Sequence, residues 1–495
     1  MDLSLLLWLP AASVLVGALL PGRTARAAAV TGSLVTLGLS IALLADFKTG
    51  HKGLQFLTNK TWISELGIHY KLGVDGLNIF FILLATLLFA ATFVWSALQE
   101  WERERTFYLW LGIAETAVLG ALLAQDLALF VAFFDLMLIP FYFLAGQWGG
   151  PGRVPAVTKL VIYTLVGSLL MLAAAVATAV LTANALNAHI TFELTNAAHT
   201  GLADNVLGKG SQEWIFLCFA AAFLVKMPLF PLHGWMPDGY RAMPMPVLAV
   251  FSGVLSKVAA YGFLRIVLPL FPAATVHFQD LMLLIALASI LYGSAMAFTT
   301  TNARLVLGYS SVAQLGFIVL GIFALRNEGA QGAILQSVNH GLVVAPAFFI
   351  VALLAARAGG SEDLRDMGGL AFRAPVLATL FLIVALATLA MPGSSNFVGE
   401  FLILLGVFRA KLVISIVAFT GVALASVYTL RLFIRAMHNR PGPAIESREM
   451  SFSDGLVLAP LVAVILFLAV YPQFILKRTE SSAAALHGTE ITVIR

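Results

Sequence analysis

The chain has 495 residues, of which 60% are hydrophobic and only 11% are charged, and its mean hydropathy is +0.95. Because charged residues are about half as frequent as in soluble domains, a water-soluble fold is excluded. The net charge of +4 comes without a basic stripe, which argues against nucleic-acid binding, and the single cysteine, Cys218, cannot form an internal disulfide or hold an iron–sulfur cluster.

Apolar runs dominate the chain, and about 20 such residues cross a bilayer as a helix. Fourteen candidate crossings follow in chain order: 3–21, 27–45, 77–97, 106–124, 127–147, 160–183, 214–231, 245–264, 281–299, 304–325, 331–356, 374–408 (interrupted), 412–433 and 453–476. No basic segment precedes the first run, so we expect a retained helix and not a cleaved signal peptide. The sequence therefore predicts an all-α polytopic membrane protein.

The distribution of positive charge predicts the orientation. Loops after odd-numbered crossings carry more than half of the 29 Lys and Arg, and long loops weigh less in the positive-inside rule. The two longest loops, 46–76 and 184–213, both follow even-numbered crossings and should share one side. We expect both termini on the outer, periplasmic side of the cell inner (plasma) membrane.

Proline interrupts two crossings, in Lys226-Met-Pro-Leu-Phe-Pro231 of the seventh and in Met391-Pro-Gly-Ser-Ser-Asn-Phe-Val-Gly-Glu400 of the twelfth. Proline lacks an N–H and clashes with the carbonyl four residues back, so each break frees carbonyl groups that only protein or water can satisfy. The breaks lie five crossings apart, which predicts two five-helix units of inverted topology, as in transporters. The expected divisions are 1–105 (crossings 1–3), 106–270 (crossings 4–8), 271–440 (crossings 9–13) and 441–495 (crossing 14 and the tail).

Isolated ionisable residues stand deep inside several of these runs. They are Glu115, Asp135, Lys226, Lys257, His340 and Glu400. A charged side chain that faced lipid at mid-membrane would cost roughly 2.5–3.5 kcal/mol, so these groups must face one another or water.

Two interpretations compete for these residues. Structural ion pairs would explain one isolated Asp and Lys, but here acids and bases alternate over at least four crossings, and two stand beside the proline breaks. Burial lowers the pKa of a lysine and a nearby carboxylate raises it again, so moving the partner can load or unload a proton. The arrangement favours a proton relay.

Three segments carry a family resemblance. They are Lys226-Met-Pro-Leu-Phe-Pro-Leu-His-Gly-Trp-Met-Pro-Asp238, Ser252-Gly-Val-Leu-Ser-Lys-Val-Ala-Ala-Tyr-Gly-Phe-Leu-Arg265 and Asn396-Phe-Val-Gly-Glu-Phe401. The chain resembles the antiporter-like membrane subunits of complex I, the proton-translocating NADH-quinone oxidoreductase. The resemblance covers nearly the whole chain, including Trp62 to Asn78.

The resemblance implies roles by position. Asp135 would be the acid of crossing 5 that pairs with Lys226, Lys257 the central lysine, His340 the histidine of crossing 11 and Glu400 the terminal acid. Glu115 would extend the relay towards Asp135, belong to a structural pair, or line a water-filled niche. The chain departs from the family twice: Asp135 replaces the usual glutamate, and Gln314 stands where a histidine is common.

The resemblance also implies a translocase subunit that has no redox centre. NADH, FMN, iron–sulfur clusters and quinone would be bound by other subunits, and this chain would hold no cofactor and no metal. The expected partners are the lipid bilayer and the other membrane subunits of complex I, including the homologous antiporter-like chains. The alternative is a subunit of a multisubunit cation/proton antiporter without a redox partner.

Overall fold

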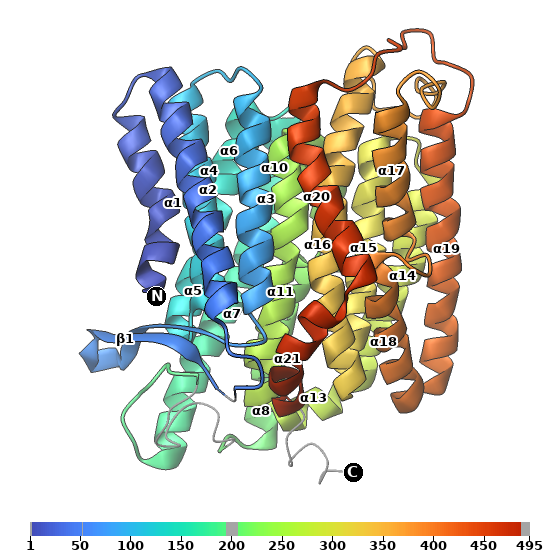
Figure 1. The fold of residues 1–495 in the computed structure, drawn as a ribbon. Helices are drawn as coiled ribbons and strands as arrows, with labels where there is room; N and C mark the ends of the chain where they lie inside the picture. Colours follow the sequence, from blue (N-terminus) through green and yellow to red (C-terminus); the bar gives the residue numbers. More distant parts are fainter. Residues whose placement is uncertain (1, 52, 195–205, 487–495) are drawn as a thin grey trace.

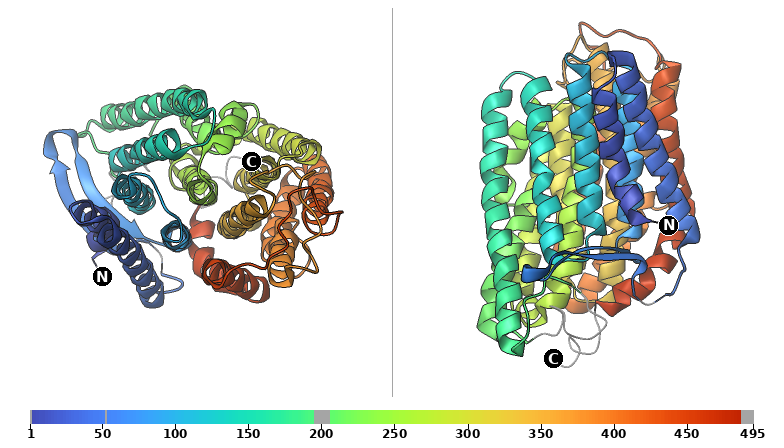
Figure 2. Two further views of the ribbon diagram at one scale, coloured as in Figure 1. Left: turned by 90° about the horizontal axis from the view of Figure 1, so that it is seen from above. Right: turned by 90° about the vertical axis from the view of Figure 1, so that its left-hand side faces the viewer.

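The computed structural model describes residues 2–51, 53–194 and 206–486. Most of this chain is helical, and the long helices run side by side in one bundle (Figure 1). Seen along the helices, the bundle is elongated, with α1 and α2 at one side and α19 at the other (Figure 2). The predicted all-α polytopic membrane fold is confirmed in this coarse sense.

The helices of the first half surround the segments that carry Asp135, Lys226 and Lys257. In chain order they are α1 (Leu3–Ala18), α2 (Gly22–Asp46), α3 (Ile79–Ala97), α4 (Glu104–Leu123), α5 (Leu127–Leu136), α6 (Leu138–Trp148), α7 (Arg153–Leu186), α8 (Lys209–Lys226), η3 (Leu232–Trp235), α9 (Met236–Ala242), α10 (Met245–Val250), the π-helical turn η4 (Phe251–Leu255), α11 (Ser256–Gly262), the π-helical turn η5 (Phe263–Val267) and α12 (Leu268–Leu270).

The helices of the second half carry His340 and Glu400. They are α13 (Pro272–His277), α14 (Gln279–Thr299), α15 (Ala303–Phe323), α16 (Asn327–Arg357), α17 (Pro375–Thr388), α18 (Ser395–Ala410), α19 (Leu412–Met437), α20 (Phe452–Val470) and α21 (Gln473–Ala485).

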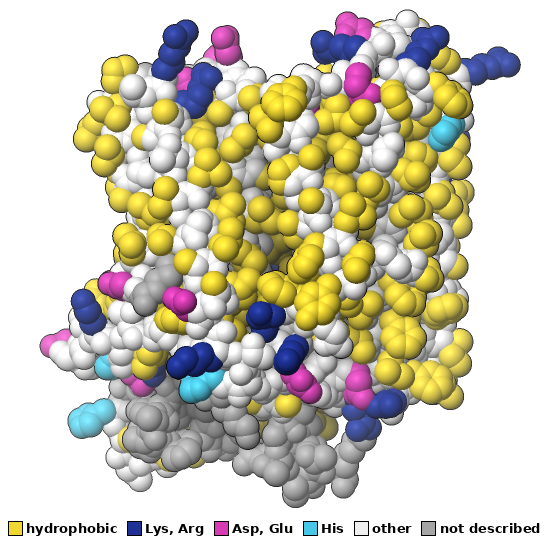
Figure 3. Space-filling model, viewed as in Figure 1, with side chains coloured by type: hydrophobic (Ala, Val, Ile, Leu, Met, Phe, Trp, Pro, Cys, Tyr) yellow, Lys and Arg dark blue, Asp and Glu magenta, His cyan; other side chains and the backbone are white. Residues whose placement is uncertain are grey.

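By length and composition, 11 helices of the described chain can cross a membrane. The other three predicted runs correspond to α1 with 16 residues, to α8, which carries Lys209, Glu213 and Lys226, and to the broken pair α17 and α18 with 14 and 16 residues. On the face shown in Figure 3, hydrophobic side chains cover the middle of the molecule, and charged ones gather towards its two ends. This distribution fits a bilayer around the bundle.

A β-hairpin occupies part of the predicted loop 46–76. Strands β1 (Gln55–Ile63) and β2 (Ile68–Val74) pair antiparallel through the short turn η1 (Ser64–Leu66). The turn closes at Gly67, whose φ of +61° favours glycine. The hairpin projects across one end of the bundle (Figure 1), where the N–H of Phe192 donates to the carbonyl of Gly67 at 3.3 Å. The two longest loops therefore meet at this end.

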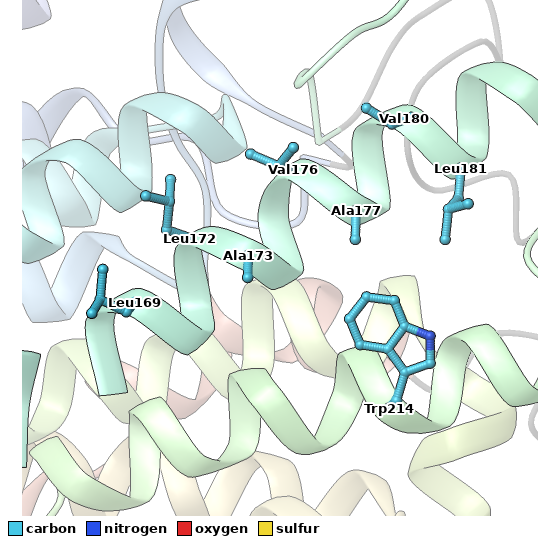
Figure 4. A pocket seen from close by; sticks show the side chains of 8 residues that line it. All are labelled: Leu169, Leu172, Ala173, Val176, Ala177, Val180, Leu181 and Trp214. Atoms are coloured by element: carbon cyan, nitrogen blue, oxygen red, sulfur yellow. The ribbon is translucent and has the colours of Figure 1, made fainter. Parts of the chain in front are cut away.

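An apolar groove of about 550 Å³ lies between α7 and α8, where Trp214 points towards α7 (Figure 4). Its lining consists of Leu169, Leu172, Ala173, Val176, Ala177, Val180, Leu181 and Trp214. Because no titratable side chain lines it, this groove suits hydrocarbon and lacks the groups that acid–base chemistry needs. The candidate site lies elsewhere, among the buried polar groups.

Candidate functional site

The ionisable residues singled out in the sequence are enclosed by the bundle. Side chains of Glu115, Lys226, Lys257, His340 and Glu400 are buried, and Asp135 is partly buried. They lie on α4, α8, α11, α16, α18 and α5, respectively. The five buried side chains do not face lipid, which removes most of the cost of placing charge in the membrane.

The end of α8 explains how Lys226 is presented. Pro228 cannot donate to the carbonyl of Leu224, so the N–H of Leu229 does so instead at 3.2 Å. The carbonyl of Val225 accepts from the indole N–H of Trp235 at 3.0 Å. Protein donors thus satisfy these two carbonyls, and α8 ends at Lys226 with its side chain inside the bundle.

Asp135 lies at a second helix break, which the sequence analysis did not predict. The run 127–147 divides at Met137 into α5 and α6. Pro140 lacks the N–H that would continue the hydrogen-bond ladder to Leu136, which accounts for the division. Phe134 and Asp135 lie in the last turn of α5, and the Phe134 carbonyl accepts from Lys226 at the end of α8.

The ion pair that the resemblance implies between Asp135 and Lys226 is not formed in this conformation. The ammonium of Lys226 donates to the carbonyl of Phe134 and lies 3.7 Å from the centre of that residue's ring. Within the described part of the chain, Oδ1 of Asp135 has no hydrogen-bond partner. The two charges nevertheless interact electrostatically.

Lys257 lies just after the π-helical turn η4. Its ammonium donates to the carbonyl of Ser252 at 2.8 Å and to the hydroxyl of Ser256 at 3.2 Å. Among the residues that the structure describes, no carboxylate forms a salt bridge with it. The charge of Lys257 acts on His340, whose Nδ1 lacks a partner in the described ranges. A π-helical turn of this kind often marks a functional site.

Glu400 belongs to a hydrogen-bonded cluster with Gln336 and Gln314. The side-chain amide nitrogen of Gln336 donates to Oε1 of Gln314 at 2.8 Å and to Oε1 of Glu400 at 3.3 Å. Gln336 was missed in the sequence because a neutral amide carries no charge in an apolar run. Its position four residues before His340, on one helix face, is the signal that could have found it.

Glycines allow α16 and α18 to approach closely at this cluster. A Cβ atom on Gly399 would lie 2.6 Å from Oε1 of Gln336 and 3.1 Å from its Cα. A Cβ atom on Gly332 would lie 2.7 Å from the backbone nitrogen of Ile403. Small residues therefore bring Glu400 against α16, as is common between membrane helices.

The break between α17 and α18 adds further polar atoms. Asn339 donates to the carbonyl of Ser395 at 2.6 Å. Both polar atoms of the Asn396 side chain and Oε2 of Glu400 are buried without a protein partner in the described chain. Buried polar atoms of this kind are usually satisfied by ordered water.

Glu115 lies against α2. Both of its carboxylate oxygens are buried without a geometric hydrogen bond to any described residue, and the hydroxyl of Ser33 is its polar neighbour. No described cation forms a salt bridge with it, which disfavours the structural pair. A water-filled niche and an extension of the relay both remain compatible with this position.

A second polar cluster, which the sequence analysis also missed, lies at the hairpin end. Arg265 pairs with Asp75 at 2.6 Å and donates to the hydroxyl of Tyr261 at 3.0 Å. Asp75 and Arg265 line a cavity of about 500 Å³. Nearby, Lys71 pairs with Glu193 at 3.0 Å. These pairs join the hairpin segment to α11–η5 and to the end of the segment after α7.

The described residues hold no group of three or more His, Cys, Asp or Glu that could bind a metal ion.

Comparisons with known proteins identify the family and the fold of the chain. The family described as NADH:quinone oxidoreductase/Mrp antiporter, TM, matches residues 124–425. NADH-quinone oxidoreductase subunit M of Rhodobacter capsulatus is 35% identical over 470 residues, which cover 94% of this chain and 90% of that protein. Subunit M of Pseudomonas aeruginosa is 36% identical over 441 residues, with 87% and 84% covered.

Two solved structures have the same fold. A chain in respiratory complex I from Thermus thermophilus with bound NADH superposes with a TM-score of 0.88 at 30% identity, covering 98% of this chain and 100% of that one. A chain in the Mrp complex from Dietzia sp. DQ12-45-1b gives a TM-score of 0.85 at 20% identity, covering 98% of this chain and 52% of that one. The second likeness concerns the fold alone.

Proposed function

The chain belongs to the subunit M family of NADH-quinone oxidoreductase, the antiporter-like membrane subunits of complex I, and from this premise we propose that it carries protons along Asp135, Lys226, Lys257, His340 and Glu400. It is thus one subunit of a larger enzyme. The observation that carries the proposal is the burial of Lys257 at 1% exposure without an acidic partner among the described residues. Ionisable residues buried inside membrane spans commonly mark proton pathways.

The proposed architecture consists of fourteen crossings with two inverted five-helix units, residues 106–270 and 271–440. Residues 1–105 and 441–495 flank the two units. The breaks after α8 and after α17 support this division, because the fourth crossing of each unit is then a broken helix. Both termini would lie on the periplasmic side of the inner membrane.

The ammonium of Lys226 would have two alternative positions at the start of the relay. In the first, the ammonium rests on the carbonyl and ring of Phe134. In the second, it would pair with the adjacent carboxylate of Asp135. At an effective dielectric constant of ~20, a pair about 4 Å apart gains about 4 kcal/mol, equivalent to about a thousandfold in proton affinity. Movement between the two positions would therefore change whether Lys226 holds its proton.

Water would connect the later members of the relay. Lys257, His340 and Glu400 are not directly hydrogen-bonded to one another in the described chain, and Nδ1 of His340 and Oε2 of Glu400 lack protein partners. Ordered water can bridge such groups at little cost. A proton released by Lys257 would pass through water to His340 and then to Glu400.

The energy for transport would come from neighbouring subunits. NADH, FMN, iron–sulfur clusters and quinone would bind there, and this chain would hold none of them. Other membrane subunits of complex I, including homologous antiporter-like chains, would transmit the redox energy as shifts of charge near Asp135. The cation/proton antiporter alternative has less support, since the Mrp chain is 20% identical to this one and subunit M of Rhodobacter capsulatus is 35% identical.

The decisive experiment replaces Lys257 by alanine in the assembled complex. Proton uptake per NADH oxidised is measured in inverted membrane vesicles, and assembly is checked on a native gel. We expect assembled complex with strongly reduced pumping. Lys411→Ala is the control, because this lysine forms a partly exposed pair with Asp280 and should not affect pumping. Normal pumping by an assembled Lys257→Ala complex would overturn the proposal.

A further inference from the structure

Gln336 uses one amide nitrogen to hold two side chains on two neighbouring helices. That nitrogen donates to Gln314 on α15 and to Oε1 of Glu400 on α18. All three side chains are buried. An amide nitrogen has two hydrogens, so both of its donors are engaged. Within the described chain, Oε2 of Glu400 is left without a partner.

We propose that Gln336 is a positioning residue that holds Oε1 of Glu400, so that Oε2 alone exchanges the proton. This inference rests on the proposed function and deepens it. A water molecule would pass a proton to Oε2 while it takes one from the water before it, which converts the carboxylate to the carboxylic acid. The reverse transfer would return the proton to the water and restore the carboxylate. Gln336 itself neither gains nor loses a proton.

The chemistry of α15 supports this assignment. Gln314 is an amide, so its side chain cannot relay a proton by titration. Among the described residues, Tyr428 of α19 is a titratable neighbour of Glu400. The hydroxyl of Tyr428 accepts a hydrogen bond from Ser310 at 3.1 Å. With no titratable group supplied by Gln314, the proton has to reach Glu400 through water. Fixing one carboxylate oxygen determines which oxygen faces that water.

The close approach of α16 and α18 leaves little free space around Gln336. Its Oε1 lies 2.6 Å from the position that a Cβ atom on Gly399 would take. The amide oxygen and nitrogen have nearly the same shape, so the orientation of the amide is set by its hydrogen bonds to Gln314 and Glu400. Gly399 supplies the room in which the amide makes both bonds.

The test compares Gln336→Leu, Gln314→Leu and Gln279→Leu in the assembled complex. Gln279 is a matched buried glutamine outside the cluster, which donates to the carbonyl of Phe323 at 2.9 Å. Losing a hydrogen bond to a charged group changes an equilibrium by about tenfold, so we expect protons pumped per NADH to fall about tenfold in Gln336→Leu. Gln314→Leu should lose less, because the hydrogen bond from Gln336 to Glu400 remains and the substitution removes only the weaker interaction of Gln314 with the carboxylate. Gln279→Leu should pump normally.

Infrared spectroscopy of the same complexes gives a readout that packing alone would not move. The carboxyl or carboxylate band of Glu400 is identified as the one that Glu400→Gln removes. We expect this band to shift in Gln336→Leu and to stay in place in Gln279→Leu. A band that stays in place in Gln336→Leu, or equal pumping losses in Gln336→Leu and Gln314→Leu, would overturn the assignment.

The same variants distinguish a failure of this inference from a failure of the proposed function. If Glu400→Gln pumps normally, the proposed relay through Glu400 is wrong, and the positioning role fails with it. If Glu400→Gln stops pumping while Gln336→Leu pumps normally, the relay stands and only the assignment of Gln336 fails.

Discussion

The ammonium of Lys226 lies over the ring of Phe134, 3.7 Å from its centre, and donates to the carbonyl of the same residue. The next residue in the chain is Asp135, the proposed acidic partner. The residue that now binds the ammonium, Phe134, and the residue that would bind it in the alternative position, Asp135, are thus consecutive at the end of α5. A small movement of the break or of the lysine would exchange the two.

Replacing Phe134 by leucine should weaken the contact that holds the ammonium of Lys226 in its present position. The substitution keeps the backbone carbonyl and removes the cation–π contact, which contributes about 0.5–2 kcal/mol. We expect Lys226 to move towards Asp135 and pumping per NADH to change by up to about thirtyfold, the equivalent of about 2 kcal/mol. Phe216→Leu is the control, since Phe216 is equally buried but stacks on Phe278. Identical pumping in both variants would show that the ring has no such role.

The carboxylate of Asp135 should be required, whereas its length should matter little. Glutamate adds one methylene, about 1.3 Å of reach towards Lys226 for carbon bonds of ~1.5 Å, so Asp135→Glu should keep most of the pumping. Asp135→Asn keeps the shape and removes the charge, so it should nearly abolish pumping. Proton uptake per NADH in vesicles checks both. If the asparagine variant pumps normally, Glu115 becomes the acid to test.

Much of the fold follows from the apolar runs, because a helix is the way in which a single segment satisfies its backbone in lipid. The family was also recognised from sequence motifs, and the comparisons confirm it. The break at Met137 was missed because the run 127–147 is long enough to be one crossing and Pro140 lies three residues beyond the break. The hairpin was missed because the prediction for 46–76 concerned only the side of the membrane, although Gly67 between two β-rich segments marks a turn.

The buried charges could be found in the sequence because each would be costly in lipid. Their contacts could not be predicted in this way. Sequence position could not reveal that Lys226 turns to the Phe134 carbonyl, since that contact depends on where α5 ends. Gln336 escaped notice because a neutral amide has no comparable cost. Its role emerges only once Gly332 and Gly399 bring α18 against α16.

The buried pair of Asp75 and Arg265 should stabilise the hairpin end of the bundle. Removing one partner leaves a buried charge without compensation, which costs about 3–5 kcal/mol. We expect Arg265→Leu to lower the thermal unfolding midpoint of the assembled complex, measured by a thermal-shift assay and native gel. The double variant Asp75→Asn with Arg265→Leu should recover part of the loss. A double variant that is less stable than Arg265→Leu alone would contradict this account.

Gly399→Ala should disturb the cluster around Glu400 through packing alone. The added Cβ would lie 2.6 Å from Oε1 of Gln336 and 3.1 Å from its Cα, so either the amide or α18 must move. Overpacking of this kind costs about 1–3 kcal/mol, and we expect both the unfolding temperature and pumping per NADH to fall. Gly146→Ala on α6 is the matched control, because nothing lies within 4 Å of its added Cβ. Alanine there should be neutral, or stabilising by up to about 1 kcal/mol through helix propensity. Equal behaviour of the two alanine variants would mean that the crossing of α16 and α18 is looser than the glycines indicate, and that Gln336 is free to leave Glu400.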